Sequence, residues 1–135
     1  MIRLVDAVAD PAAARAAALD EFRSGGLVVL PTETVYGLAV LPSGPGAVDA
    51  MFRRKGRSDN RPVAVLVADV DQARTVVEPG PAFELLAASF WPGPLTVVTT
   101  RGVGFSARLG GDQVTVGVRC PDHELVRALA AEVGP

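Results

Sequence analysis

Short apolar runs and longer amphipathic stretches follow one another along the chain. Four apolar runs have the length of buried strands, at residues 27–30, 63–68, 95–100 and 114–119. Stretches with apolar residues on one face predict helices at residues 11–23, 47–54, 69–76, 81–90 and 121–131. Because strands and helices are interleaved, the pattern predicts an α/β fold with helices packed on one layered sheet.

The first predicted helix has clear signals at both ends. Asp10 followed by Pro11 is typical of an N-cap and a first helical position. The spacing of Ala16, Leu19 and Phe22 predicts the face that turns to the core, and a Ser-Gly-Gly sequence ends the helix.

Composition narrows the class of protein. The chain has 135 residues, 49% of them hydrophobic, with a formal net charge of -2, so we expect one domain over 1–135 that is not a polycation. Cys120 is the single cysteine, which excludes an internal disulfide. The N-terminal stretch does not have the pattern of a signal peptide, and no apolar run approaches the ~20 residues of a membrane span. These features predict a cytoplasmic protein.

A polar cluster follows the first apolar run. Thr32, Glu33, Thr34 and Tyr36 come directly after Leu30 and Pro31, where ligands bind in many α/β sheets. Hydroxyl groups can hold a small polar ligand without adding charge. The alternative interpretation is structural, with a threonine capping a following helix and the tyrosine in the core. The residues alone favour neither interpretation.

A basic run follows the second predicted helix. It contains Arg53, Arg54, Lys55, Arg57 and Arg61, and such a cluster suits a polyphosphate because arginine forms forked hydrogen bonds and lysine acts as a point charge. The spacing is not that of a phosphate-binding loop of the Walker type. The alternative is a solvated basic turn.

The last predicted strand presents an arginine. Thr115, Gly117 and Arg119 are every second residue of the strand and therefore lie on the same face. An arginine at the end of an apolar strand needs an anionic partner. That partner is either a protein carboxylate, such as Glu33, or the carboxylate of a substrate.

Three further residues are interpreted as structural. Trp91 lies in a rigid corner of sequence FWPGPLT, His123 is expected at the surface or as a cap, and Cys120 as a small core residue. The sequence contains neither zinc-like ligand spacing nor a Ser-His-Asp signature.

Four segments together resemble the YrdC family of threonylcarbamoyl-adenylate synthases. They read PTETVYGL, KGR....RP, FWPGPLT and VGVRCP, in an order and spacing that cover most of the chain. The resemblance implies a single YrdC-like domain, with a twisted mixed sheet and flanking helices around a concave basic cavity. It implies that L-threonine, bicarbonate and ATP form threonylcarbamoyl-AMP and pyrophosphate, for tRNA threonylcarbamoyladenosine modification.

The resemblance also implies roles for individual residues. It places Thr34, Tyr36 and Arg119 at the threonine. It places Lys55, Arg57, Arg61 and Thr115 at the nucleotide, with Lys55 and Arg57 as the catalytic residues. The expected Mg²⁺ arrives with ATP and takes its ligands from phosphate and water, so no protein metal site is expected.

Departures from the family pattern are mild in the body of the chain. Ser58 replaces a usual proline, Val63 a usual leucine, and Leu66 a histidine of some relatives. Family members continue past the last helix into a strand and a serine–asparagine motif that binds the nucleotide. This chain stops at Pro135, which suggests a fragment or a short paralogue that is C-terminally incomplete.

Two alternative functions stay open. The first is a non-catalytic YrdC-like module that binds a nucleotide or RNA, with tRNA or tRNA-modification proteins as partners. The second is carbamoyl transfer within a larger chain. The few aromatic residues and the negative net charge argue against a large RNA footprint.

Overall fold

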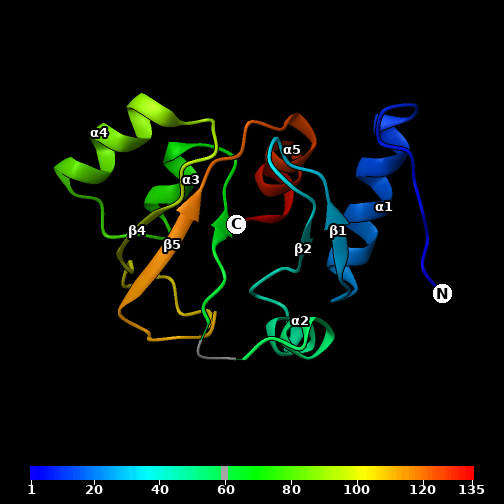
Figure 1. Ribbon diagram of the computed structural model, residues 1–135, viewed down its shortest axis with the longest axis horizontal. Coiled ribbons are helices and arrows are strands. Elements are labelled where there is room, and N and C mark those ends of the chain that lie inside the picture. The colour runs from blue at the N-terminus through cyan, green and yellow to red at the C-terminus, as the bar shows by residue number, and fades with distance from the viewer. Residues whose placement is uncertain (59–60) are drawn as a thin grey trace.

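The computed structural model describes residues 1–58 and 61–135, and over these residues the α/β class is confirmed (Figure 1). The elements, in chain order, are α1 (Pro11–Arg23), β1 (Val28–Leu30), β2 (Gly37–Ala39), α2 (Ala47–Lys55), β3 (Val65–Leu66), α3 (Val70–Arg74), α4 (Pro81–Phe90), β4 (Val97–Thr100), β5 (Thr115–Arg119) and α5 (Glu124–Val133). In Figure 1, α1 and α5 lie beside the β1–β2 hairpin, and α3 and α4 lie beside the other strands.

The predicted caps of α1 are present, but its buried face differs from the prediction. The carboxylate of Asp10 accepts a hydrogen bond from the Ala13 N–H at 2.9 Å, and Pro11 is the first helical residue. Leu19 and Phe22 are buried as expected, whereas Ala16 is exposed. The prediction for Ala16 was wrong because α5 packs along a stripe that includes Ala14 and Ala18, which lie one turn apart.

The strands of the described residues form two sheets, which differs from the single sheet predicted. β5 pairs in parallel with β3 and antiparallel with β4, so this three-stranded sheet is mixed. Among the residues that the structure describes, β1 pairs only with β2, in an antiparallel hairpin that joins Val28 to Ala39 and Leu30 to Gly37.

The strand β2 was not predicted from the sequence, and its pairing in the hairpin explains why. β2 has three residues, one of them Gly37, and it becomes a strand only through its pairing with β1. β1 is also less buried than its apolar sequence predicts, because Val29 is 62% exposed and only Leu30 is buried.

Several boundaries follow tertiary contacts rather than the sequence pattern. β3 is shorter than its apolar run, because the backbone N–H of Val63 turns away to the carbonyl of Leu109. The last helix begins at Glu124 rather than Pro121, and His123 is its N-cap. The helix at 81–90 is confirmed at both ends, and α2 runs one residue beyond the predicted Arg54.

Two apolar clusters form the core. The larger one joins the three-stranded sheet to α2, α3 and α4 and includes Val67, Val76 and Val118, which are almost completely buried. The smaller one joins α1, α5 and β1 through Phe22 and Leu129. Over 1–58 and 61–135, no helix combines the length and the apolar character that a membrane span requires.

Candidate functional site

The turn between β1 and β2 is built around the Thr32 side chain. Its Oγ1 accepts hydrogen bonds from the N–H groups of Thr34 at 3.2 Å and Val35 at 3.1 Å, and donates to the Val35 carbonyl at 2.7 Å. Thr32 therefore caps a turn, although a strand rather than a helix follows. Tyr36 is 77% exposed, so the interpretation of Tyr36 as a core residue was wrong.

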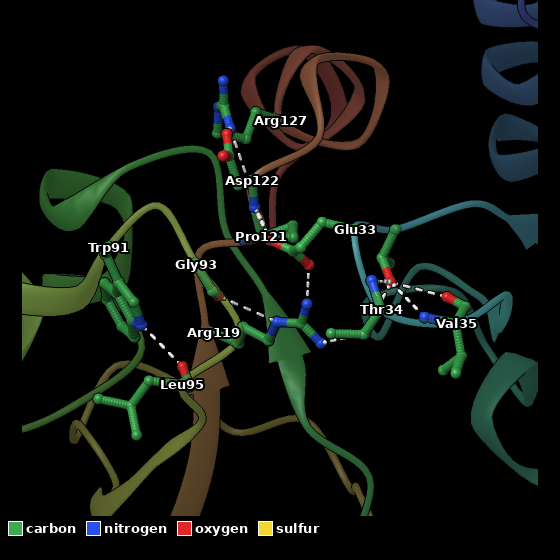
Figure 2. A network of polar contacts seen from close by, with 11 residues as sticks. Glu33, Thr34, Val35, Trp91, Gly93, Leu95, Arg119, Pro121, Asp122 and Arg127 are labelled. Carbon is green, nitrogen blue, oxygen red and sulfur yellow. Dashed lines mark hydrogen bonds and ion pairs between the residues drawn. The ribbon is translucent and has the colours of Figure 1, made fainter.

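Arg119, at the end of β5, lies against this turn (Figure 2). One terminal nitrogen of its guanidinium forms an ion pair with Glu33, and the other donates to Thr34 Oγ1 at 3.2 Å. Its Nε donates to the carbonyl of Gly93 at 3.2 Å. The Arg119 and Glu33 side chains are 14% and 22% exposed. Arg119 therefore pairs with the carboxylate of Glu33, one of the two anionic partners expected for it.

The Trp91 corner holds one of these acceptors in place. The indole N–H of Trp91 donates to the Leu95 carbonyl at 2.8 Å, and its ring packs edge-on against Phe83. The N–H of Gly93 donates to the Cys120 carbonyl at 2.9 Å, which fixes the corner to the end of β5. The structural interpretation of this motif is confirmed, and the corner also orients Arg119.

The network continues into the start of α5 (Figure 2). The second carboxylate oxygen of Glu33 accepts from the backbone N–H of Asp122. The guanidinium of Arg127 binds the Asp122 carboxylate at 3.1 Å and the Pro121 carbonyl at 2.9 Å. Glu33 thus connects three segments that are far apart in the sequence.

The basic run begins on the last turn of α2. Lys55 is the final residue of the helix, and Gly56 closes it with a φ of 59°, in the left-handed region that favours glycine. Lys55 and Arg61 are exposed, and Arg57 donates to the Pro62 carbonyl at 2.9 Å. Asp59 and Asn60, inside the same predicted loop, lie outside the described residues.

A cavity of about 170 Å³ lies over the start of β5. Its lining residues are Pro62, Val63, Ala64, Thr96, Val98, Arg101, Leu109, Asp112, Thr115, Val116 and Gly117. The lining contains one basic and one acidic residue, Arg101 and Asp112. The lining is therefore not basic, in contrast to the concave basic cavity expected from the family resemblance. On the neighbouring loop, Arg57 donates to the carbonyl of Pro62, which is one of the lining residues.

Two functional candidates at this cavity were missed in the sequence. The Asp112 carboxylate accepts from the N–H groups of Val114 at 2.8 Å and Thr115 at 2.7 Å, and from the Thr115 hydroxyl. Arg101 binds the carbonyls of Ala107 and Thr115 and lies over the Phe105 ring. An aspartate three residues before a strand is a recognisable turn signal, whereas nothing in the neighbouring sequence indicates a role for Arg101.

Replacing Asp112 by asparagine should destabilise the fold at neutral pH and matter less in acid. These hydrogen bonds, the backbone ones first, lower the pKa of Asp112 from its usual 3.8. A lowered pKa stabilises the folded state above the unfolded pKa, and this stabilisation is lost as the pH falls through the folded value.

The measurement for Asp112 is the free energy of unfolding of wild type and Asp112→Asn between pH 7 and pH 2.5. The difference should be constant above about pH 5 and shrink below pH 4. Asp20→Asn, on the exposed side of α1, is the matched control. A difference for Asp112→Asn that is independent of pH would contradict the assignment.

The two remaining reactive side chains are structural. Cys120 is buried, as predicted, and burial raises the pKa of its thiol. His123 is the N-cap of α5 but caps through its backbone position, since its side chain makes no capping hydrogen bond.

The predicted site residues thus fall into two groups along β5. Thr34 and Arg119 are in contact at its carboxyl end, and Thr115 lines the cavity at its start. Four residue steps separate Thr115 from Arg119, which corresponds to about 13 Å along a strand. Tyr36, Lys55 and Arg61 are exposed, and within the described part of the chain no hydrogen bond or ion pair joins their side chains to either group.

The mixed α/β fold and the four segments PTETVYGL, KGR....RP, FWPGPLT and VGVRCP together identify the family to which the chain belongs. The sequence profile of the Sua5/YciO/YrdC family, described as "Telomere recombination", matches residues 20–135. The chain belongs to the Sua5/YciO/YrdC family.

Curated relatives and solved structures agree with this assignment. The chain is 39% identical over 127 residues to a threonylcarbamoyl-AMP synthase of Bacillus subtilis, covering 93% of this chain and 36% of the relative. It is 40% identical over 117 residues to the human threonylcarbamoyl-AMP synthase, covering 84% of this chain and 40% of the relative. The chain therefore spans little more than a third of these relatives.

A solved structure gives the same picture. Sua5 of Pyrococcus abyssi, crystallised in complex with L-threonine, superimposes with a TM-score of 0.80 at 36% identity, over 87% of this chain and 35% of Sua5. YciO of Escherichia coli superimposes with a TM-score of 0.80 at 21% identity, over 90% of this chain and 60% of YciO, which supports the fold alone.

Proposed function

We propose that this chain is the synthase domain of a threonylcarbamoyl-AMP synthase. It would combine L-threonine, bicarbonate and ATP into threonylcarbamoyl-AMP and pyrophosphate, as a nucleotidyltransferase. The relatives named above carry that activity in their names, and the related Sua5 was crystallised with L-threonine.

The observation that carries the proposal is the arrangement of the exposed face of β5. Thr115, Gly117 and Arg119 point to one face, while Val116 and Val118 are buried on the other. This face joins the cavity at Thr115 to the arginine at the other end of the strand. Because Gly117 has no side chain, a ligand can extend along the strand between the two ends.

The threonine end supplies recognition of a small polar acid. Arg119 would bind the substrate carboxylate with a charge-assisted, forked hydrogen bond. Thr34, already bonded to Arg119, offers a hydroxyl beside it. Tyr36 is exposed next to this turn, which suits a role as a wall of the site once a ligand is present.

The nucleotide end supplies charge and shape. Thr115 and the apolar residues of the cavity would hold the nucleoside part, and Lys55, Arg57 and Arg61 the phosphates. Mg²⁺ is proposed to enter as the Mg–ATP complex, because phosphate oxygens and water are its preferred ligands.

The reaction itself requires little covalent help from the protein. A carbamate oxygen of N-carboxylated threonine attacks the α-phosphorus of ATP, the bond to the β-phosphate bridging oxygen breaks, and pyrophosphate leaves. The chain would hold the two reactants in line and offset the negative charge on the phosphates through Lys55 and Arg57. RNA binding, a tRNA-modification partner and a cytoplasmic location stay predictions.

The test is release of pyrophosphate by this chain, supplied with Mg–ATP, L-threonine and bicarbonate. Release should require all three, and Lys55→Ala or Arg57→Ala should lower its rate at least about a hundredfold, because each removes a cation at the developing charge. Arg54→Ala is the matched control for Lys55→Ala, since both residues are exposed on the last turn of α2. If Lys55→Ala and Arg57→Ala are as active as Arg54→Ala, the phosphate assignment is wrong.

A further inference from the structure

In the ion pair between Glu33 and Arg119, every polar atom of both side chains already has a hydrogen-bond partner (Figure 2). Each of the three nitrogens of the guanidinium has an acceptor: the Gly93 carbonyl, Thr34 Oγ1 and the Glu33 carboxylate. Both oxygens of Glu33 also have donors, one on Arg119 and one on the backbone N–H of Asp122.

This full pairing restricts how a ligand carboxylate can reach Arg119. A forked contact uses two guanidinium nitrogens, and both must be free of competing partners on that side. Gly93 is held by the Trp91 corner, and Thr34 by the turn built on Thr32. Of the three partners of Arg119, only Glu33 is charged, and its side chain has several rotatable bonds. A ligand carboxylate can therefore replace the Glu33 carboxylate at a lower cost than it can replace Gly93 or Thr34.

The displaced Glu33 then needs a new partner. It would keep the N–H of Asp122 but lose the cation that neutralised it, in a place where its side chain is only 22% exposed. Leaving a partly buried carboxylate without its cation is unfavourable, and this cost offsets much of the free energy that the ligand gains by binding Arg119. A ligand that carries a cation next to its own carboxylate removes this cost.

We propose that Glu33 is a specificity-determining residue that selects a zwitterionic α-amino acid. The amino acid would open the Glu33–Arg119 pair, its carboxylate taking Arg119 and its ammonium taking Glu33 before the nitrogen is carboxylated. This inference rests on the proposed function, which places an amino acid at Arg119, and adds the recognition of its ammonium group.

The proposal sets the order of affinities for three small probes. L-threonine satisfies both charges of the pair. (R)-3-hydroxybutyrate, which lacks the ammonium, leaves Glu33 without a cation, and L-threonine amide, which lacks the carboxylate, cannot displace Glu33 from Arg119. Both analogues should bind wild type at least about tenfold more weakly than L-threonine does.

The experiment is calorimetric titration of wild type and Glu33→Gln with these three probes. In Glu33→Gln the displaced group is neutral, so the ratio of the dissociation constants of (R)-3-hydroxybutyrate and L-threonine should fall at least about tenfold. Glu33→Asp, which retains the charge, should recover part of the ratio and replaces Glu33→Gln if that variant does not fold. Glu132→Gln, which loses ion pairs between α5 and the α1 residues Arg15 and Arg23, is the matched control.

The outcomes separate this inference from the proposed function. An unchanged ratio in Glu33→Gln, or equal weakening of all three probes, would show that Glu33 only positions Arg119 and would overturn the inference. Selective threonine binding without pyrophosphate release would overturn the proposed function alone. Absence of threonine binding by folded wild type would overturn both.

Discussion

Replacing Arg119 by methionine should weaken L-threonine binding at least about a hundredfold, because truncating one partner of a partly buried charge pair costs several kcal/mol. Arg119 is the cation that reaches Thr34, and the Gly93 carbonyl and the turn hydroxyl fix its orientation. Methionine retains much of the length and apolar stem of the side chain, so the loss would come from the guanidinium.

The measurement is calorimetric titration of Arg119→Met with L-threonine and, separately, with Mg–ATP. Nucleotide binding should change only a few-fold, because about 13 Å of strand separates Arg119 from Thr115. Arg119→Lys should recover little, since an ammonium cannot form the forked contact.

A matched control comes from the same network. Arg127 lies on the first turn of α5 and binds the Asp122 carboxylate and the Pro121 carbonyl, without a contact to Thr34 or Glu33 in the described part of the chain. Arg127→Met should lower the free energy of unfolding as much as Arg119→Met does, about 1–3 kcal/mol, and leave threonine affinity nearly unchanged. If both variants lose threonine binding equally, Arg119 has no special role in it.

Replacing Gly117 by valine should weaken Mg–ATP binding at least about a hundredfold and leave threonine binding largely intact. A Cβ atom at Gly117 would lie 3.3 Å from Thr96 Cγ2, 3.7 Å from Ala64 Cβ and 3.8 Å from Val98 Cγ2. These three side chains line the cavity of about 170 Å³ in which the nucleoside is proposed to lie, so a valine side chain among them should reduce the space for the ligand.

The fold should tolerate this change. The backbone of Gly117 does not have a positive φ, and β-branched residues are favoured in strands. Thermal unfolding should confirm that the variant is folded, and calorimetry with Mg–ATP should then show at least about a hundredfold loss of affinity, since the added atoms occupy the ligand's volume.

Gly80 offers the matched glycine-to-valine control. It is the extended N-cap of α4, and a Cβ atom there meets nothing within 4 Å. Gly80→Val should bind Mg–ATP as wild type does. If Gly117→Val also retains its affinity, the nucleotide does not lie over β5 and the cavity has another use.

Local chemistry in the sequence was enough for the elements with strong end signals. Asp10 and Pro11 define the start of α1, and Pro81 and the WPGP corner define α4, because caps and prolines act on neighbouring backbone atoms. The alternation of Thr115, Gly117 and Arg119 likewise follows from the two-residue period of a strand. The hypothesis of a polar ligand site at residues 32–36 came from residue types alone.

The tertiary structure decided which of these groups meet. The sequence offered Glu33 as one of two possible anionic partners of Arg119. Only the structure shows that its carboxylate binds both Arg119 and the N–H of Asp122, which are 86 and 89 residues away. The short strand β2, which pairs with β1, and the exposure of Ala16 also depend on contacts between elements. The sequence by itself determined the candidate groups and the elements other than β2, because propensity, capping and periodicity are local. Only the tertiary structure decided the charge pairing and the cavity over β5, because both arise between segments that the chain brings together from far apart.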